Sequence, residues 1–137
     1  GTARRYRRAA MLDAVHHVAL ICREYTRSRA FYVDLLGLEV VHEVFREKRR
    51  SWKLDLRIGH AQIELFSFPD PAERPSYPEA TGLRHLAFSV PALEPVIARL
   101  QSAGVEVEAI RTDEYTGQRF TFFQDPDGLP LELYETG

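Results

Sequence analysis

Hydrophobic and polar positions run through the same order of elements twice along the chain. The first pass predicts a strand, a helix and three further strands, over Val15–Cys22, Thr26–Leu36, Glu39–Arg46, Trp52–Ile58 and Ala61–Phe68. The second pass predicts the same order over Leu83–Val90, Ala92–Ala103, Val105–Ile110, Arg119–Gln124 and Leu131–Tyr134. The chain is therefore predicted to be a tandem repeat of one βαβββ module, in the α+β class.

Residues that favour helix ends and turns support these boundaries. Thr26 is expected to cap the first helix at its N-terminus, and Gly37 and Gly104 suit the left-handed conformation that ends a helix. Gly59–His60 predicts a tight hairpin, and the sequence DPDG at 125–128 predicts a turn before the last strand.

A proline-rich segment separates the two modules. Residues 69–82 contain four prolines, which disfavour a regular helix or an inner strand, so this segment is expected to be a linker. The predicted organisation is an N-terminal extension at 1–10, a first module at 11–68, the linker at 69–82 and a second module at 83–137. The two modules are expected to form one domain, because 137 residues suit a single core.

Chemistry-bearing residues recur with a constant offset between the modules. His17 and His85 are 68 positions apart, and the same offset separates Glu64 from Glu132. Strand alternation places each histidine among small residues, and the large apolar neighbours of each glutamate point to the opposite face. Taken singly, each of the four fits an ordinary core histidine or a solvent-facing glutamate. Their repetition indicates a site for one divalent metal ion, such as Zn, Ni, Mn, Co or Fe(II).

Composition and charge narrow the functions further. The net charge of -2 disfavours nucleic acid as a partner, because phosphate binding requires a basic surface. The sequence contains no apolar run long enough for a membrane span. Cys22 is the only cysteine, and its apolar strand predicts a buried, inert thiol. These features favour a cytoplasmic protein with a small-molecule partner.

Four short motifs accompany these residues: HHVAL at 16–20, IELF at 63–66, RHLAFSV at 84–90 and DPDGLPLEL at 125–133. Together they resemble the vicinal oxygen chelate family, which includes glyoxalases, bleomycin-resistance proteins and extradiol dioxygenases. The similarity covers about residues 12–135 and is greatest to the small glyoxalase I-like bacterial branch. The resemblance implies a cupped mixed sheet with the helices outside, a homodimer, and a metal held by His17, Glu64, His85 and Glu132.

The resemblance also implies a mechanism. In glyoxalase I the metal polarises the substrate's oxygens and stabilises the enediolate left when a neighbouring C–H loses its proton. Glu64 or Glu132 would then act as the general base. The implied function is that of a metal-dependent lyase similar to lactoylglutathione lyase, acting on a small carbonyl substrate such as the methylglyoxal–glutathione hemithioacetal.

Two alternatives from the same family stay open. One is an Fe(II) ring-cleaving dioxygenase, although such an enzyme uses two histidines and one carboxylate rather than all four ligands. The other is a resistance protein that sequesters a ligand without turnover, a class that usually lacks the metal ligands. The complete set of His and Glu residues favours the lyase.

The sequence departs from glyoxalase I where that enzyme holds its substrate. Ile21 stands where glyoxalase I has an arginine that engages glutathione. Two charged segments, 45–56 and 111–123, supply candidates for contact with an anionic substrate: Arg46, Trp52, Lys53, Arg111, Tyr115 and Arg119. Among these, Arg111 and Arg119 are the expected substrate-binding residues.

Overall fold

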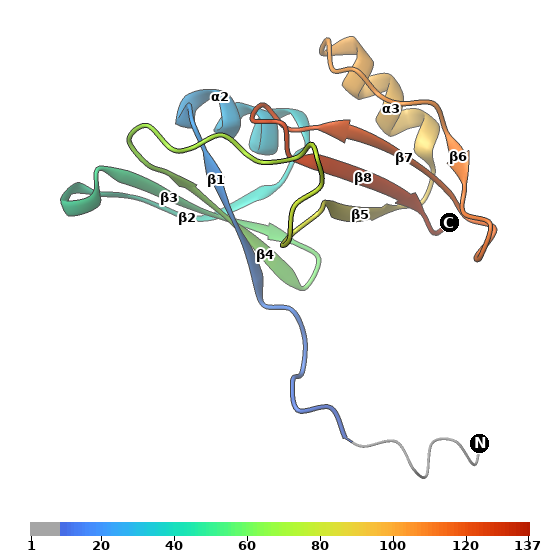
Figure 1. The fold of residues 1–137 in the computed structure, drawn as a ribbon, viewed down its shortest axis with the longest axis horizontal. Coiled ribbons are helices and arrows are strands. Elements are labelled where there is room, and N and C mark those ends of the chain that lie inside the picture. The colour runs from blue at the N-terminus through green and yellow to red at the C-terminus, as the bar shows by residue number, and fades with distance from the viewer. Residues whose placement is uncertain (1–8) are drawn as a thin grey trace.

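The computed structural model describes residues 9–137 (Figure 1). Residues 1–8, most of the predicted N-terminal extension, lie outside the described part. The first half contains β1 (His17–Cys22), α2 (Tyr25–Arg29), the π-helical turn η1 (Ala30–Leu35), β2 (Glu39–Arg46), the 3-10 turn η2 (Glu47–Arg49), β3 (Ser51–Ile58) and β4 (Ala61–Ser67). The second half contains β5 (Leu86–Val90), α3 (Leu93–Ser102), β6 (Arg111–Thr112), β7 (Arg119–Gln124) and β8 (Pro130–Glu135).

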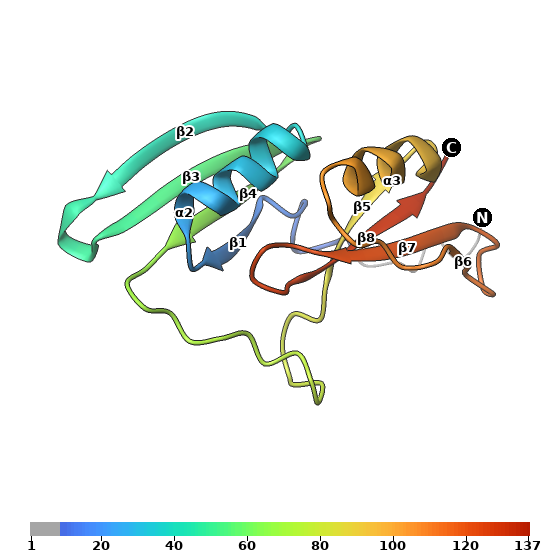
Figure 2. The same ribbon diagram turned by 90° about the horizontal axis from the view of Figure 1, so that it is seen from above.

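The strands form two four-stranded mixed sheets with the same topology. Their orders are β1-β4-β3-β2 and β5-β8-β7-β6. In each sheet the first strand pairs in parallel with the last, and the other pairs are antiparallel. Figures 1 and 2 show the two sheets side by side, each with its own helix. The predicted α+β class of tandem βαβββ modules is confirmed, and within this chain the predicted cupped sheet consists of two separate sheets.

One face of each sheet packs into the hydrophobic core. On β4, Ile63 and Leu65 are each only 1% exposed, and Leu131 and Leu133 occupy the matching buried positions on β8. Burying an aliphatic side chain of this size stabilises the fold by about 1.5–3 kcal/mol. Because side chains alternate along a strand, residues between these leucines and isoleucines project from the opposite, open face of the sheet.

The first helix differs from its prediction at its start and in its second half. It begins at Tyr25 with Glu24 at the N-cap, so the expected cap at Thr26 is wrong. From Ala30 the turns widen into η1, where the Leu36 amide donates to the Phe31 carbonyl. The predicted left-handed stop at Gly37 is confirmed by its φ of 79°. None of the helices within residues 9–137 is long and apolar enough to cross a membrane.

The segment Val105–Ile110 is not the strand that its apolar alternation predicts. Its valines do pack against the core, yet regular pairing with β7 begins only at Arg111, in the two-residue strand β6. Before that point the Glu108 amide donates to the Phe122 carbonyl, and the Thr121 hydroxyl donates to the Glu108 carbonyl. The Thr121 side chain thus occupies the Glu108 carbonyl, a backbone group that continuous strand pairing would use.

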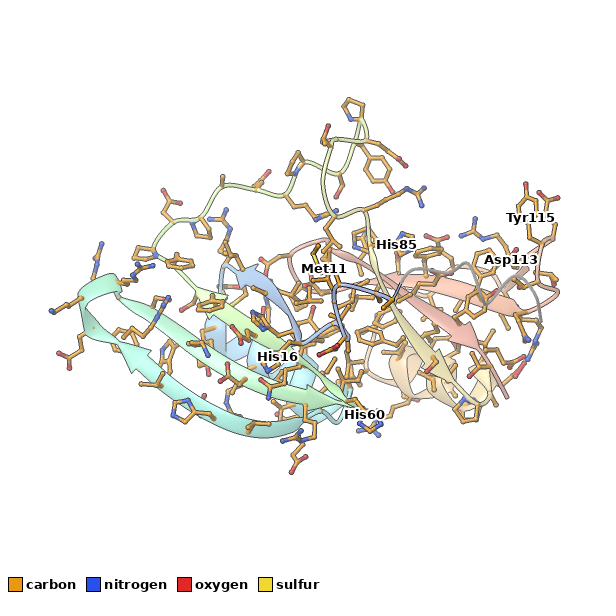
Figure 3. All side chains as sticks on the ribbon, turned by 90° about the horizontal axis from the view of Figure 1, so that it is seen from below. Met11, His16, His60, His85, Asp113 and Tyr115 are labelled. Atoms are coloured by element: carbon orange, nitrogen blue, oxygen red, sulfur yellow. The ribbon has the colours of Figure 1, made fainter. Side chains whose placement is uncertain are left out.

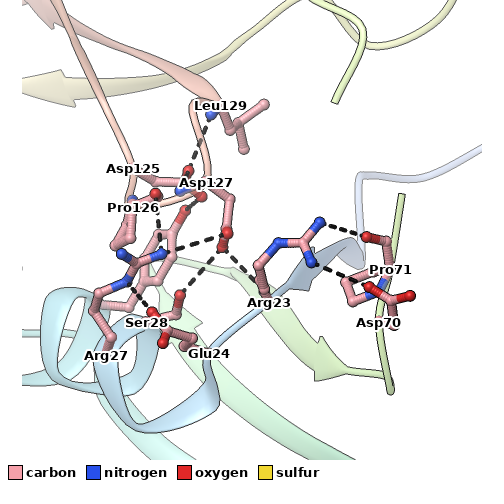
Figure 4. Close-up of polar contacts among 11 residues, drawn as sticks. Arg23, Glu24, Arg27, Ser28, Asp70, Pro71, Asp125, Pro126, Asp127 and Leu129 are labelled. Carbon is pink, nitrogen blue, oxygen red and sulfur yellow. Dashed lines mark hydrogen bonds and ion pairs between the residues drawn. The ribbon is translucent and has the colours of Figure 1, made fainter. Parts of the chain in front are cut away.

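The DPDG turn of the second module docks on the first helix (Figure 4). The Tyr32 hydroxyl donates to Asp125 Oδ2 over 2.8 Å, and the Ser28 hydroxyl donates to Asp127 Oδ2 over 3.4 Å. The Arg23 amide donates to the same Asp127 oxygen, and Arg27 forms an ion pair with Asp127. These polar contacts hold the two modules together at the end of the sheets.

Candidate functional site

Each module carries one histidine beside one glutamate. His17 Nδ1 lies 3.6 Å from Glu64 Oε2, and His85 Nε2 lies 3.1 Å from Glu132 Oε1. Both pairs arise from the same strand register. Glu64 pairs with Ala19 and Glu132 pairs with Ala87, so each glutamate sits opposite the residue two positions after its histidine. Side chains two apart share a face, which brings each carboxylate next to its imidazole.

The glutamates are largely withdrawn from solvent. The exposed fraction is 14% for the Glu64 side chain and 12% for that of Glu132, against 41% for His17 and 26% for His85. A carboxylate in such surroundings requires a cation or several hydrogen-bond donors to offset its lost hydration.

The first pair has further charged neighbours on β3. Lys53 Nζ lies 2.6 Å from Asp55 Oδ1 and 3.9 Å from Glu64 Oε1. Asp55 is the direct cross-strand partner of Glu64, which brings a second carboxylate to this face. Asp55 was not predicted from the sequence, because only the pairing register of β3 and β4 reveals it.

The second pair borders a cavity of about 520 Å³. His85 and Glu132 contribute to its wall together with Arg111, Phe120 and Phe122. The His85 ring meets Phe122 edge to face, with ring centroids 5.1 Å apart. The Arg111 guanidinium lies over both phenyl rings, 5.0 Å from the centroid of Phe120 and 5.4 Å from that of Phe122. The structure thus places Arg111 at the cavity wall, where its guanidinium also donates to Glu108 Oε1 over 3.1 Å. Its role in binding substrate stays a prediction.

Arg119 lies elsewhere. Its guanidinium donates to Glu135 and to Glu94, at distances of 2.8–2.9 Å. These two carboxylates hold the pKa of Arg119 above its usual value. Because both acidic partners come from the chain itself, Arg119 joins β7 to β8 and to the start of α3, away from the residues that form the cavity wall with His85.

The structure does not unite the two pairs within one chain. Among residues 9–137, no group of three or more His, Cys, Asp or Glu side chains is close enough to hold a metal ion. Figure 3 shows the same separation, since His16, the neighbour of His17, lies at the first sheet and His85 lies at the second. Among the described residues, the chain alone therefore presents two half-sites, the pair His17–Glu64 and the pair His85–Glu132.

The donor atoms of each half-site nevertheless fit a divalent metal. Ligands at about 2.0–2.2 Å, with angles of about 90–109° at the metal, lie about 2.8–3.6 Å from each other. The observed nitrogen–oxygen separations of 3.6 and 3.1 Å are close to that range. Imidazole nitrogens and carboxylate oxygens are the donors that Zn, Mn, Co, Ni and Fe(II) accept.

Two βαβββ modules, each with a His–Glu pair on its open face, define a glyoxalase-like protein. The chain belongs to the Glyoxalase/Bleomycin resistance protein/Dioxygenase superfamily, whose pattern matches residues 14–133. This membership confirms the resemblance seen in the sequence motifs.

Relatives of high identity extend over nearly the whole chain. The protein YaeR of Escherichia coli (strain K12) is 60% identical over 125 residues, covering 90% of this chain and 97% of YaeR. YwkD of Bacillus subtilis (strain 168) is 58% identical over 126 residues, covering 91% of this chain and 98% of YwkD. Both are described as uncharacterized. The crystal structure of a glyoxalase family protein from Enterococcus faecalis has a TM-score of 0.85 and 48% identity, covering 92% of this chain and all of that one.

More distant similarity reaches a glutathione transferase and, in fold, a fosfomycin resistance protein. Glutathione transferase FosA of Serratia marcescens is 29% identical over 126 residues, covering 90% of this chain and 82% of FosA. FosX of Listeria monocytogenes, solved in complex with Mn(II) and a sulfate ion, shares the fold with a TM-score of 0.71 at 19% identity, covering 93% of this chain and 95% of FosX. The proteins similar to this chain thus include a transferase and, among proteins of the same fold, one that was solved with Mn(II) bound.

Proposed function

We propose that this chain is a divalent-metal-dependent lyase or isomerase of the glyoxalase I type, acting on a small carbonyl substrate. The repeated His–Glu pair carries the proposal. The two pairs occupy equivalent positions in two sheets of equal topology, and each places a part-buried carboxylate beside an imidazole. Packing alone gives no reason to repeat such a pair, because each buried carboxylate costs free energy. Superfamily membership and an enzyme relative such as FosA also support the proposal.

The complete metal site is proposed to form between two copies of the chain. His17 and Glu64 of one protomer would face His85 and Glu132 of its partner, so that a homodimer contains two identical sites. The support is the separation of the half-sites within one chain, where residues 9–137 contain no group of three ligands. A closed two-fold arrangement would pair each half-site once and leave neither unused.

Within that site the chain's own residues have distinct roles. The chemistry that a bound divalent metal supplies is Lewis-acid polarisation of substrate oxygens. Glu132 is the proposed general base, because it lines the 520 Å³ cavity and can reach a proton of a substrate held there. Glu64, which has Lys53 as a neighbour, is the alternative base. Arg111 would meet an anionic group of the substrate, with Phe120 and Phe122 beneath it.

Metal content and turnover test the proposal first. Protein purified without chelator should contain close to one divalent transition ion per chain, measured by elemental analysis. His85→Ala should lose this ion, whereas His60→Ala, a change in the exposed β3–β4 turn outside both pairs, should keep it. The methylglyoxal–glutathione hemithioacetal, supplied with Zn, Ni, Co or Mn, is the first substrate to assay. Absence of metal from both the parent and His60→Ala would refute the proposed site.

Hybrid dimers test whether the site is shared. One variant carries His17→Ala with Glu64→Ala, and the other carries His85→Ala with Glu132→Ala. Each variant alone should bind no metal. In a dimer of the two, a shared arrangement leaves one site with all four ligands and the other with none. Verified hybrids should therefore bind one metal per dimer, and hybrids that bind none would show that each site belongs to a single chain.

A further inference from the structure

The open face of the first sheet carries a second group of residues next to the His17–Glu64 pair. Arg46 ends β2 and pairs with Ser51, while Lys53 pairs with Phe66. Alternation places all of these side chains on the face of Glu64, because Phe66 lies two residues after Glu64 on β4. Lys53 connects the two groups, with its Nζ atom 3.9 Å from Glu64 Oε1.

Two cations lie over one aromatic surface on this face. The Arg46 guanidinium is 4.8 Å from the ring centroid of Phe66 and 5.7 Å from that of Phe68. The Lys53 ammonium is 5.9 Å from the same Phe66 centroid. The planes of the Phe66 and Phe68 rings are nearly parallel, with an interplanar angle of 11°. Cation–π contacts of this kind hold the charged groups in place while leaving their N–H donors available.

Arg46 lacks a carboxylate partner within the described part of the chain. Among its five N–H donors, one on Nη2 donates to the Ser51 hydroxyl over 2.8 Å, and Nε is buried with no acceptor. Arg29 is neutralised by Glu43, and Arg57 by Glu39. Arg49 and Arg50 have no ion pair among residues 9–137 either, but their side chains are exposed to water, whereas that of Arg46 is half-buried. A half-buried guanidinium without a counter-ion costs free energy, and an anion from outside the chain would offset that cost.

We propose that Arg46, assisted by Lys53, forms a subsite for a small oxyanion, so that the substrate carries a phosphate, phosphonate or carboxylate group. Arg46 is the main contact, because its fork of donors suits a planar or tetrahedral oxyanion and no acidic side chain of residues 9–137 competes for it. Lys53 contributes less, since Asp55 neutralises part of its charge. The inference rests on the proposed function only in placing the substrate's reacting oxygens at the neighbouring His17–Glu64 half-site.

Binding of inorganic phosphate and of acetate to the metal-free full chain tests this subsite, by calorimetry at low ionic strength. Arg46→Gln should weaken binding of the preferred anion by about tenfold or more, the loss of a charge-assisted hydrogen bond. Arg49→Gln removes a charge from the exposed turn three residues away and should leave binding within about twofold, as expected for an exposed charge screened by water and salt. Arg46→Lys keeps the positive charge but loses the planar set of donors, so its affinity for the anion should lie between those of Arg46→Gln and Arg49→Gln. Preference for phosphate over acetate, or the reverse, identifies the class of oxyanion.

The outcomes separate this inference from the proposed function. Equal weakening by Arg46→Gln and Arg49→Gln, or no binding of either anion by the parent chain, overturns the subsite. A parent chain that binds no metal, while Arg46→Gln still loses anion binding selectively, overturns the metal-dependent function and leaves the subsite intact. Circular dichroism of Arg46→Gln checks that loss of folding is not the cause of weaker binding. Lys53→Gln is a second variant, and it should weaken anion binding less than Arg46→Gln does.

Discussion

The hydroxyl of Tyr32 offers a sharp test of how the two modules are joined. Tyr32 is fully buried in η1 of the first module, and its hydroxyl donates to Asp125 Oδ2 at the start of the DPDG turn in the second. The other oxygen of Asp125 accepts from the amides of Asp127 and Leu129, so it is satisfied within the turn itself. Tyr32→Phe therefore removes one donor from a half-buried carboxylate and leaves the turn otherwise intact.

The expected loss follows from that geometry. Leaving a buried acceptor without its donor costs about 1–3 kcal/mol, and a charged acceptor lies toward the upper part of that range. Burial already raises the pKa of Asp125, and the hydrogen bond from Tyr32 opposes this effect. A loss of about 2 kcal/mol, with a denaturant dependence of about 1.5 kcal/mol per M, would lower the urea midpoint by about 1 M.

Urea unfolding at neutral pH, followed by circular dichroism, measures this loss. Tyr115→Phe is the matched control, because Tyr115 is 88% exposed and its hydroxyl makes no hydrogen bond to any of residues 9–137. The control should change the free energy of unfolding by less than about 0.5 kcal/mol. If Tyr32→Phe loses no more than the control does, the hydrogen bond to Asp125 does not join the modules in the way described.

Three further outcomes are expected. The Arg119 guanidinium holds the pKa of Glu135 below its usual 4.5, so the stability from this pair is present above pH 4.5 and is lost as the pH falls through the lowered pKa. Thermal melts of Arg119→Met should thus depend less on pH below 4.5 than those of the parent. Burial raises the pKa of Cys22 to about 11, so a disulfide reagent at about pH 8 should label it only after unfolding; labelling of the native chain at the rate of a free thiol would contradict its burial. Leu131→Ala, at a position with no exposure, should lower the free energy of unfolding by about 2–5 kcal/mol in urea, and a loss below about 1 kcal/mol would contradict its place in the core.

Local sequence signals predicted the elements well where hydrogen bonding is local or the pattern is strong. The strand β2 has its predicted bounds, and Gly37 and Gly104 end their helices with positive φ. The prediction was wrong at Val105–Ile110, where apolar alternation is present but the pairing partner is only partly available. It was also wrong at Thr26, because the N-cap is Glu24, two residues before the position that the capping preference indicates.

The sequence by itself determined which residues share a face. Side chains alternate along a strand with a period of two, so the apolar positions of each strand show which of its residues face the core. In both modules this places the histidine and the glutamate on the face opposite the core. Tertiary structure alone decided what surrounds those faces. It kept His17–Glu64 apart from His85–Glu132 and put Arg111 at the cavity and Arg119 between two carboxylates. It also gave Arg46 no carboxylate partner among residues 9–137. Such contacts join residues far apart in the chain, and no periodicity along one strand encodes them.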